Sequence, residues 1–530
     1  MKLDRRLILL ICLPAALAAQ ALDPAKLLQP SADTWPTYNG DYSGRRYSPL
    51  SRINARNVRN LGLAWAYRAE TGAGGNPFGT QIKSTPLEVN GVLYFTVPDH
   101  AWAVDARTGR QLWHFKWETK GGIHIGNRGV GIYGNWLFFE TPDDYLVSLD
   151  KNTGKQRWAV EIADLKQEYF ATPAPLVIGN HVLVGVGGDS LDVPGFLEAR
   201  DPETGSVQWR WDSEPKPGEP GSESWPNQDA MAHGGGMTWM PGTYDPALNL
   251  IYWGTGNPNP VHAGQGRKGD DLWTCSIVAL NPDTGKMAWW FQASPHDTHD
   301  WDNVETPVLF DAEFDGRPRK LLAQASRNGY FFVLDRTNGK RLVTAPFIDL
   351  NWSKGVDARG EPIPDPAKEP KTDGSLVVPA SNGATNWPPP SFDPVTGLFY
   401  VNTTQSYSVF YLTDTAERPE GYGGRDSGVW SQSALKAIDY KTGKIRWSHP
   451  FRGEGFATPG LLSTAGNLLF TGDHSGNFIA FDPASGKILW HAGLAAPVTN
   501  GPMTYELDGR QYLVVGARDM LYAFISPSEQ

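Results

Sequence analysis

The sequence predicts an all-β protein made of short strands that repeat around a ring. Composition is the first observation behind this prediction, because 58 Gly, 42 Pro and 21 Trp in 530 residues favour turns and short strands over long helices. The second is a hairpin pattern that recurs seven times along the chain. The third is the spacing of these copies, which is short except at two places.

Each copy of the pattern joins an apolar strand to a second strand through a tight turn. In six copies a Trp follows the Asp or Asn at the start of the turn by eight residues, and in VLDRTNGKRLV (333–343) Val343 takes the Trp position. We expect the Gly of each turn to adopt a positive φ. One hairpin cannot bury an indole alone, so neighbouring units must stack. The six copies are AVDARTGRQLW (103–113), SLDKNTGKQRW (148–158), ARDPETGSVQW (199–209), ALNPDTGKMAW (279–289), AIDYKTGKIRW (437–447) and AFDPASGKILW (480–490).

Seven copies and one further sheet predict a ring of eight blades, within a single domain that covers residues 35–526. Residues 511–525 would supply the inner strands of the last blade, and residues 61–69 would return as its outer strand and close the ring. Two long insertions fall in 201–281 and 335–439. Because long structured loops on a rigid scaffold commonly carry function, we expect the functional site there.

The N-terminus, MKLDRRLILLICLPAALAAQALDP, predicts a signal peptide over residues 1–21. A basic start precedes an apolar run that is too short for a membrane span, so we expect an exported, periplasmic protein with no membrane span in its mature chain. That chain would keep only Cys275, so it could form no internal disulfide, and it has no C-x-x-C-H motif for covalent haem. A formal charge of −10 argues against nucleic-acid binding and would suit a cationic protein partner.

The segment SPHDTHDWDNVETP (294–307) holds an unusual concentration of titratable side chains. Strands avoid aspartate, and unpaired carboxylates are costly to bury, so the segment is expected to hold a metal ion, a proton or water. The segment alone leaves these three alternatives open. Its titratable residues are His296, Asp297, His299, Asp300, Asp302 and Glu305.

The Asp-x-x-Thr-Gly-x-x-x-Trp repeat resembles the tryptophan-docking repeat of the quinoprotein alcohol dehydrogenases. These are eight-bladed β-propellers that carry pyrroloquinoline quinone (PQQ) and a metal ion on the central axis. The resemblance covers about residues 35–525. It implies that Trp239, in GGGMTWMPGTYDP, lies flat under the quinone. It also implies that Arg327, in ASRNGYFFVLDR, contacts the quinone oxygens.

Further segments resemble the family's cofactor and metal ligands. GNRGV places Arg128 against a carboxylate of the cofactor, with Thr172 nearby, and TNWPPPSFDPVTGLFY supplies Asn386. YDPALNLIYWGTGNPNP supplies Asn257 as a ligand of the metal. PHDTHDWD resembles the family's P-H-D-x-W-D-x motif and places Asp300 at the catalytic aspartate. These residue types suit a tricarboxylate and a hard cation, which need guanidinium donors and oxygen ligands.

Asp302 matches an extra aspartate in the lanthanide-using members of this family, so the metal is expected to be Ca²⁺ or a lanthanide. His299 stands where the family has Trp. His296 and Asp297 are expected to brace the loop by hydrogen bonds and not to ligate the metal.

The chain also departs from the family at three other places. Ser190, which we keep in the predicted metal set, replaces a metal-binding Glu, and Asp189 or Asp192 could supply the missing carboxylate. Lys83 replaces a Glu near the first blade and could pair with a carboxylate of PQQ. The vicinal disulfide that covers the quinone in many members cannot form, because Cys275 is alone.

The resemblance implies a periplasmic dehydrogenase that oxidises an alcohol or polyol by hydride transfer to PQQ. Asp300 would take the hydroxyl proton as hydride leaves the carbinol carbon, while the metal and Arg327 would polarise the quinone. Without a haem of its own, the protein would pass electrons to a separate acceptor such as a cytochrome c.

Two alternatives remain open. A non-catalytic propeller scaffold would allow any residue at the cofactor-site positions on the central axis. In this sequence, however, Asn257, Asp300 and Arg327 are all present. A metal-dependent hydrolase could use a cluster around His296 and His299, but zinc sites of this kind need three protein ligands and an open water position.

Overall fold

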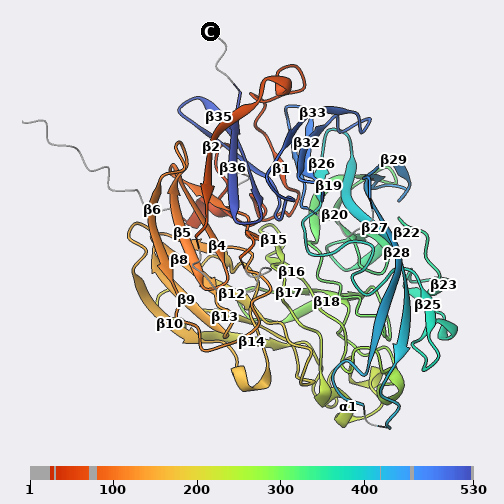
Figure 1. Ribbon diagram of the computed structural model, residues 1–530. Coiled ribbons are helices and arrows are strands. Elements are labelled where there is room, and N and C mark those ends of the chain that lie inside the picture. The colour runs from red at the N-terminus through yellow and green to blue at the C-terminus, as the bar shows by residue number, and fades with distance from the viewer. Residues whose placement is uncertain (1–23, 29–30, 71–79, 418, 454–458, 527–530) are drawn as a thin grey trace, which may run out of the picture.

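The computed structural model describes residues 24–28, 31–70, 80–417, 419–453 and 459–526. The predicted signal peptide lies outside them. The described chain forms eight antiparallel sheets arranged as blades around an axis, so the predicted all-β, eight-bladed β-propeller is confirmed (Figure 1). A candidate membrane-crossing helix was not found among the described residues.

Each blade has a core of four strands, and the innermost strand comes first in seven of them. The first four blades are β3 (Leu87–Val89), β4 (Val92–Val97), β5 (His100–Asp105), β6 (Gln111–Lys116); β7 (Gly131–Tyr133), β8 (Trp136–Glu140), β9 (Tyr145–Asp150), β10 (Gln156–Glu161); β11 (Leu176–Ile178), β12 (His181–Gly185), β13 (Phe196–Arg200), β14 (Val207–Asp212); and β15 (Thr243–Asp245), β16 (Leu250–Gly254), β17 (Ser276–Leu280), β18 (Met287–Gln292). The next three are β19 (Val308–Phe314), β20 (Arg317–Ala325), β21 (Tyr330–Asp335), β22 (Lys340–Pro346); β26 (Ser391–Asp393), β27 (Leu398–Leu412), β28 (Gly424–Asp439), β29 (Ile445–Pro450); and β30 (Leu462–Thr464), β31 (Leu468–Gly472), β32 (Asn477–Phe481), β33 (Ile488–Gly493).

The eighth blade joins the two ends of the chain, as predicted. Strand β2 (Gly62–Arg68) pairs antiparallel with β36 (Met520–Ile525), with Arg68 opposite Met520. The inner strands are β35 (Arg510–Ala517) and β34 (Met503–Leu507), and the sequence analysis did not assign β34. The ring is therefore closed by backbone hydrogen bonds between residues more than four hundred positions apart.

The remaining elements are short. They are β1 (Tyr47–Ser48), which pairs with β30; β25 (Ser375–Val377), which pairs with β27; the hairpin β23 (Ser353–Val356) and β24 (Pro362–Pro364); the helix α1 (Gln228–His233); and the 3₁₀ turns η1 (Pro24–Leu28), η2 (Val58–Asn60), η3 (Leu165–Gln167), η4 (Ser222–Ser224), η5 (Gly264–Gly266) and η6 (Pro366–Lys368).

The Trp of one blade docks on the turn of the next. The indole N–H of Trp113 donates to the carbonyl of Lys151 at 2.9 Å, and a Cβ on Gly154 would lie 2.6 Å from the Trp113 ring. The same contact joins Trp209 to Gly285. Six of the seven turn Gly residues thus have two reasons for their identity, a positive φ and a neighbouring indole, whereas Gly443 faces Val343 and Ala345.

The eighth blade contributes a docked Trp that the sequence analysis missed. Trp65 on β2 donates its indole N–H to the carbonyl of Ala106 at 3.2 Å, and a Cβ on Gly109 would lie 2.7 Å from its ring. Trp490 has no such turn opposite, because the outer two strands of the eighth blade, β36 and β2, are not consecutive in the chain. It packs edge-on against Phe524 instead, with ring centroids 5.4 Å apart.

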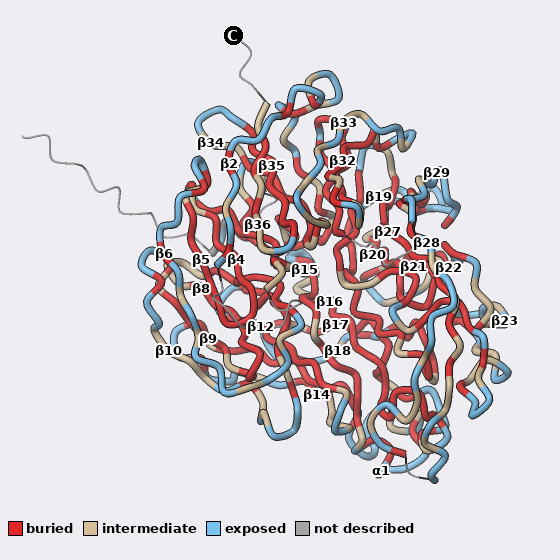
Figure 2. Tube along the Cα trace, in the orientation of Figure 1, coloured by how far each residue is buried: buried red, intermediate tan, exposed pale blue. Residues whose placement is uncertain are grey.

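The N-terminal segment 35–48 fills the interior of the ring. Arg46 is fully buried and donates to the carbonyls of Tyr38 (2.8 Å), Leu461 (2.9 Å) and Pro502 (2.5 Å), which ties this segment to the last two blades. Tyr38 packs with Trp239 and Trp387, described below. Figure 2 shows the buried strands gathered around the axis, with exposed residues at the rim.

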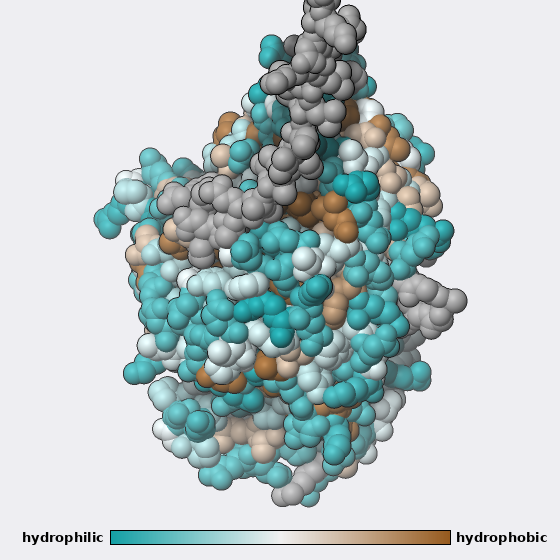
Figure 3. Space-filling model, turned by 90° about the vertical axis from the view of Figure 1, so that its left-hand side faces the viewer, coloured by the Kyte–Doolittle hydropathy of each residue, from teal (hydrophilic) through white to brown (hydrophobic). Residues whose placement is uncertain are grey.

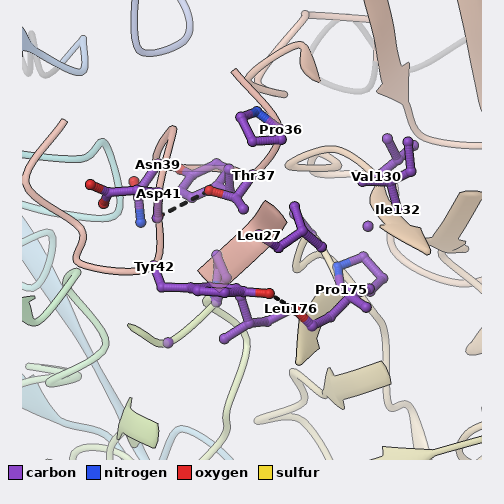
Figure 4. A pocket seen from close by; sticks show the side chains of 16 residues that line it. Leu27, Pro36, Thr37, Asn39, Asp41, Tyr42, Val130, Ile132, Pro175 and Leu176 are labelled. Atoms are coloured by element: carbon purple, nitrogen blue, oxygen red, sulfur yellow. Dashed lines mark hydrogen bonds between the residues drawn. The ribbon is translucent and has the colours of Figure 1, made fainter. Parts of the chain in front are cut away.

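The 3₁₀ turn η1, which precedes this segment, packs over the junction between two neighbouring blades. Leu27 of η1 is 3% exposed and borders a narrow pocket of about 20 Å³ beside Leu176 (Figure 4). Tyr42 lines this pocket and donates its hydroxyl to the carbonyl of Val177 at 2.6 Å.

On the side of the molecule shown in Figure 3, hydrophobic side chains are scattered among hydrophilic ones.

Candidate active site

A cavity of about 350 Å³ forms where loops from six blades converge. These loops either connect one blade to the next or join the second and third strands of a blade, and both kinds emerge at the same end of the ring. The size is within the range of small-molecule sites. The lining residues are Lys83, Ile125, Arg128, Phe170, Gly187, Asp189, Trp239, Asp300, Asp302, Arg327, Asn382, Gly383, Thr385, Asn386, Trp387, Thr404 and Tyr422.

One wall of the cavity combines two indoles with a buried cation. The guanidinium carbon of Arg128 lies 4.7 Å from the ring centroid of Trp239 and 4.9 Å from that of Trp387. Arg128 is 4% exposed, and its Nη1 donates to the carbonyl of Thr172 at 3.3 Å. Its Nε is buried and has no hydrogen-bond partner among the described residues. An unused donor on a buried cation fits an anionic ligand.

Lys83 adds a second cation to the same cavity. It is half-buried and donates its ammonium to the carbonyl of Ile125. Burial, and then the charge of Arg128, lowers the pKa of Lys83 to about 8. Among the described residues neither cation forms a salt bridge, so both are available to carboxylates of a bound molecule.

Asn386 and Thr172 have different positions. Asn386 lines the cavity, donates to the carbonyl of Asn382 at 3.0 Å and accepts from the backbone N–H of Trp387 at 2.8 Å. Thr172 is buried behind the wall, where its hydroxyl donates to the carbonyl of Trp239 at 3.2 Å. Asn386 can therefore touch a ligand, whereas Thr172 positions the wall.

Arg327 lies among carboxylates, and its guanidinium carbon is 5.6 Å from the ring centroid of Trp239. Its Nη1 donates to the carbonyl of Asp300 at 2.6 Å and lies 3.3 Å from Asp300 Oδ1. Its Nη2 lies 3.2 Å from Asp302 Oδ2, and its Nε lies 3.9 Å from Glu305 Oε1. Asp300 itself has a φ of 67°, an uncommon backbone conformation that often marks a functional position.

Asp302 connects three parts of the site. Its Oδ2 accepts from the indole N–H of Trp239 at 2.9 Å, and its Oδ1 accepts from the backbone N–H of Asn257 at 2.7 Å. Asn257 is buried, and its Nδ2 donates to the carbonyl of Pro258 at 3.2 Å. Asp302 thus orients the aromatic wall and the Asn257 segment, in addition to any role toward a metal.

Charge and burial together shift the pKa values of Asp300, Asp189 and Arg327. Burial raises the pKa of Asp300 well above its usual value, Arg327 opposes the shift, and Asp302 and Asp189 reinforce it. Burial, with the charge of Asp302, raises the pKa of Asp189 to about 7. Burial alone would lower the pKa of Arg327, but the surrounding carboxylates raise it. A carboxylate with a raised pKa is a better proton acceptor than an ordinary aspartate.

The structure places Ser190 outside the cavity, which corrects its assignment to the metal. The side chain of Ser190 is exposed, whereas that of Asp189 lines the cavity and keeps Oδ1 buried without a hydrogen-bond partner among the described residues. Asp192 is engaged elsewhere, because it accepts from His233 Nδ1 at 3.0 Å and from the backbone N–H of Gly421 at 2.8 Å. The available carboxylate therefore comes one position earlier, from Asp189.

The histidines of the 294–307 segment are held by the protein. His296 Nδ1 lies 2.9 Å from a backbone carbonyl oxygen, and Asp297 Oδ2 accepts from the backbone N–H groups of His299 (3.3 Å) and Trp301 (3.1 Å). His299 stacks on Trp301, with ring centroids 4.3 Å apart. Among the described residues no three His, Cys, Asp or Glu side chains converge as a metal site by themselves. A hydrolytic zinc site at His296 and His299 is therefore not favoured.

The lining residues that were not predicted from the sequence include Trp387 and Tyr422, and Asp189 was named only as an alternative to Asp192. Trp387 directly follows Asn386, so its indole could have been recognised as a second aromatic contact. Asp189 adjoins Ser190, and a one-residue shift in the loop decides which of them faces inward. Tyr422 gave no signal, because it lies in the connection between β27 and β28, which is far in sequence from every motif.

The donor set fits PQQ and a hard metal ion. Arg128 Nε supplies an unused buried donor beside Lys83, which suits carboxylates, and Trp239 supplies an aromatic face. Asp189 Oδ1 supplies an unused buried acceptor near Asp302, which suits a hard cation. Arg128 and Lys83, together with the carboxylates around Arg327, match a bound anion that itself carries a metal.

Comparison with known proteins agrees with this geometry. The family described as the PQQ glucose, ethanol and alcohol dehydrogenase β-propeller domain matches residues 35–346 and 429–513. The chain is 36% identical to the quinoprotein alcohol dehydrogenase PedH of Pseudomonas putida, over 96% of this chain and 90% of that protein. It is 33% identical to a lanthanide-dependent methanol dehydrogenase of Methylacidiphilum fumariolicum, over 94% of this chain and 86% of that protein.

A solved structure gives the same result in three dimensions. The quinohemoprotein alcohol dehydrogenase of Comamonas testosteroni superposes with a TM-score of 0.87 at 32% identity, over 97% of this chain and 84% of that chain. Fold, cavity and sequence similarity thus lead to one conclusion: the chain belongs to the family of PQQ-dependent quinoprotein alcohol dehydrogenases.

Proposed function

We propose that this protein is a periplasmic quinoprotein dehydrogenase that oxidises an alcohol or polyol, with Asp300 as the base and with Ca²⁺ or a lanthanide beside PQQ. The observation that carries the proposal is Arg128, a buried guanidinium between two indoles whose Nε is unpartnered and whose cavity also holds the catalytic carboxylate. When bound, PQQ supplies the two-electron acceptor and the metal supplies a Lewis acid.

The protein's first task in this mechanism is to bind and orient. Arg128 and Lys83 would pair with the carboxylates of the cofactor, and Trp239 would offer it an aromatic surface. Arg327 holds its guanidinium toward the cavity, because Asp300 and Asp302 fix it on two sides. Asn386 adds a polar contact at the edge.

The second task is proton transfer. Asp300 accepts the proton of the substrate hydroxyl through its carboxylate as the carbinol C–H bond breaks. The alcohol thereby loses two electrons and two protons and becomes a carbonyl compound. Arg327 partly offsets the rise that burial causes in the pKa of Asp300, and this favours the ionised carboxylate that would act as the base.

The metal would be held by oxygen ligands from Asp189, Asp300, Asp302 and Asn257. Asp189 would supply the carboxylate that Ser190 lacks. Its position in the cavity lining and its unpartnered Oδ1 support this assignment. Relatives named for lanthanide dependence and for europium make a lanthanide a reasonable occupant beside Ca²⁺. A trivalent ion gains more from several carboxylates than Ca²⁺ does.

Export and electron transfer complete the proposal. The N-terminal sequence supports a periplasmic location. Because the sequence has no C-x-x-C-H motif, electrons would leave to a separate acceptor, and one relative is named a 1-butanol dehydrogenase (cytochrome c).

The decisive experiment is uptake of PQQ by the purified apoprotein, measured by calorimetry with Ca²⁺ or La³⁺ and followed by an alcohol assay with an artificial dye. We expect one PQQ per chain, and we expect Arg128→Gln to weaken binding at least tenfold. Arg210→Gln is the matched control, because Arg210 also stacks on an aromatic ring but lies outside the cavity.

Failure of PQQ uptake with both metals would remove the dehydrogenase proposal and leave the scaffold alternative.

The variant Asp302→Ala tests the choice of metal. We expect this variant to lose lanthanide-supported activity first, and its tryptophan fluorescence should be compared with that of the wild type, because Asp302 also holds Trp239.

A further inference from the structure

The tip of the long β27–β28 ribbon presents one large side chain to the cavity. Residues 421–424 read GYGG, and Tyr422 lines the cavity together with the carboxylates Asp189, Asp300 and Asp302. Cofactor binding and proton transfer to Asp300 do not require a phenol, so Tyr422 is available for another task. Because it lies in the same cavity as the base, contact with the substrate is the most direct one.

Backbone hydrogen bonds on two sides hold this tip in place. The carbonyl of Tyr422 accepts from the backbone N–H of His262 at 2.8 Å. The backbone N–H of Gly421 donates to Asp192 Oδ1 at 2.8 Å, so the tip is bound to the loop that also carries Asp189. Tyr422 is therefore presented by a fixed backbone, as a residue that discriminates between substrates must be.

The hydroxyl of Tyr422 supplies a hydrogen-bond donor near the carboxylates. Loss of hydration raises the pKa of Tyr422, and the charges of the three cavity carboxylates raise it further. The phenol therefore keeps its proton throughout the neutral pH range. Its hydroxyl has no hydrogen-bond partner among the described residues, and 47% of the residue is exposed, so a small molecule can reach it. Such a donor suits a substrate that carries a second oxygen beside the reacting one.

We propose that Tyr422 determines specificity by donating a hydrogen bond to a second hydroxyl of the substrate, so that the enzyme selects short vicinal diols. This inference deepens the proposed function and rests on it, because Asp300 has to receive the proton of the reacting hydroxyl. In a vicinal diol the two oxygens lie on adjacent carbons, so one can face Asp300 while the other faces the phenol. The cavity of about 350 Å³ must also hold the cofactor, which leaves room for only a short substrate.

Only one of the two carbinol groups is oxidised. That group loses its hydroxyl proton to Asp300 and a hydride to the two-electron acceptor, and a C=O bond forms. The second hydroxyl is unchanged, so a terminal diol gives a 2-hydroxy aldehyde. A monoalcohol leaves the Tyr422 hydroxyl without a substrate partner, and a site built to bond a hydroxyl discriminates against the analogue that lacks it.

The test compares one diol with its matching monoalcohol. For the PQQ- and metal-loaded protein, kcat/KM is measured with an artificial dye for 1,2-propanediol and for 1-propanol, and the ratio of the two values is the readout. The wild type is expected to favour the diol. We expect Tyr422→Phe to lower the ratio by roughly five- to tenfold, the loss that follows from one hydrogen bond.

Tyr411→Phe is the matched control, because Tyr411 lies on β27 of the same ribbon but outside the cavity lining. It should leave the ratio unchanged. Binding is measured separately by calorimetry in the loaded Asp300→Asn variant, which holds the diol without oxidising it. Adding Tyr422→Phe to this variant should weaken the binding of 1,2-propanediol by a similar factor.

The inference is overturned if Tyr422→Phe keeps the wild-type ratio, including the case in which both rates fall in proportion, since that result would indicate a structural role. It is equally overturned if the diol binds the Asp300→Asn variant as tightly without the phenol hydroxyl as with it. A wild type that takes up no PQQ, or that oxidises neither compound when loaded, contradicts the proposed function itself, and this inference then falls with it.

Discussion

Asp300 combines features that an ordinary surface aspartate lacks. Its backbone has a φ of 67°, its carbonyl accepts from Arg327, and its carboxylate lies 3.3 Å from the same guanidinium. The negative charges of the neighbouring Asp302 and Asp189 disfavour ionisation of Asp300 and so raise its pKa. In the proposed mechanism, this loop would present one carboxylate to the substrate, with one arginine holding it in place.

Replacing this carboxylate separates catalysis from binding. We expect Asp300→Asn to reduce turnover by about 10²–10⁴-fold, the usual contribution of a positioned base. The amide has the same shape, so PQQ uptake should change much less. Cofactor occupancy is measured by absorption in the same sample as the rate. Wild-type turnover at full occupancy would mean that the base lies elsewhere.

Lys83 gives the cofactor site a pH dependence. Its folded-state pKa is lowered to about 8 by burial and by Arg128, so its ammonium is charged at pH 6.5 and loses its proton as the pH rises through 8. Because a carboxylate-bearing cofactor binds the charged form better, PQQ affinity should fall between pH 7 and 9. Lys83→Met should bind PQQ more weakly at pH 6.5 and lose most of this dependence. A variant with the same slope as the wild type would exclude Lys83 as its source.

At the scale of elements, the docking of each indole on the next turn organises the ring. The turn Asp accepts from the backbone N–H groups that follow it: Asp150 accepts from those of Asn152 at 3.0 Å and Thr153 at 2.9 Å. The Gly then reverses the chain and leaves room for the ring of Trp113. One eleven-residue pattern therefore encodes a turn, a strand pair and the contact with the neighbouring blade.

Two glycines with nearly the same backbone can measure this contact. Gly285 has a φ of 68°, and a Cβ there would lie 2.6 Å from the Trp209 ring, whereas Gly316 has a φ of 70° and open space around that position. Gly316→Ala should cost about 1–2 kcal/mol for the left-handed conformation alone. Gly285→Ala should cost about 1–3 kcal/mol more, because the indole must move. Urea unfolding of both variants checks this, and equal losses would mean that the indole adjusts freely.

The repeats explain why so much of the fold was predictable. A turn, its Gly and its Trp are local in sequence, so the blades could be counted and the closing strand 61–69 assigned. The segment 35–48 has no repeat and contacts residues hundreds of positions away, such as Pro502, so its place inside the ring could not be foreseen. Similarly, the choice of Asp189 over Ser190 depends on loop conformation, which residue type does not determine.

Across the whole molecule, some carboxyl groups outside the cavity lining are also buried. Glu88, on the inner strand of the first blade, is fully buried; its Oε1 accepts from the backbone N–H of Gly91 at 2.7 Å, and its Oε2 has no partner among the described residues. Asp144 is also fully buried, and neither of its oxygens has a partner among the described residues. Such groups constrain the ring and also make its stability sensitive to pH.

Burial raises the folded-state pKa of Glu88 to about 8, opposed in part by the Gly91 N–H, and burial with the charge of Asp143 raises that of Asp144 to about 8. The unfolded chain ionises these carboxyls near pH 4. Their contribution to stability is therefore complete below about pH 4 and is lost progressively as the pH rises toward 8. We expect the free energy of unfolding of the apoprotein to fall by a few kcal/mol between pH 5 and pH 8, since each unit of displacement corresponds to about 1.4 kcal/mol.

Glu88→Gln tests this at one position, because the amide fills the same space and cannot ionise. Relative to the wild type, the variant should gain stability steadily as the pH rises from 5 to 8. Glu118→Gln, at an exposed carboxylate, serves as the control and should follow the wild type throughout. Urea midpoints at four pH values provide the measurement. If Glu88→Gln runs parallel to the wild type across this range, Glu88 is already ionised in the folded ring and the pH dependence must come from other groups.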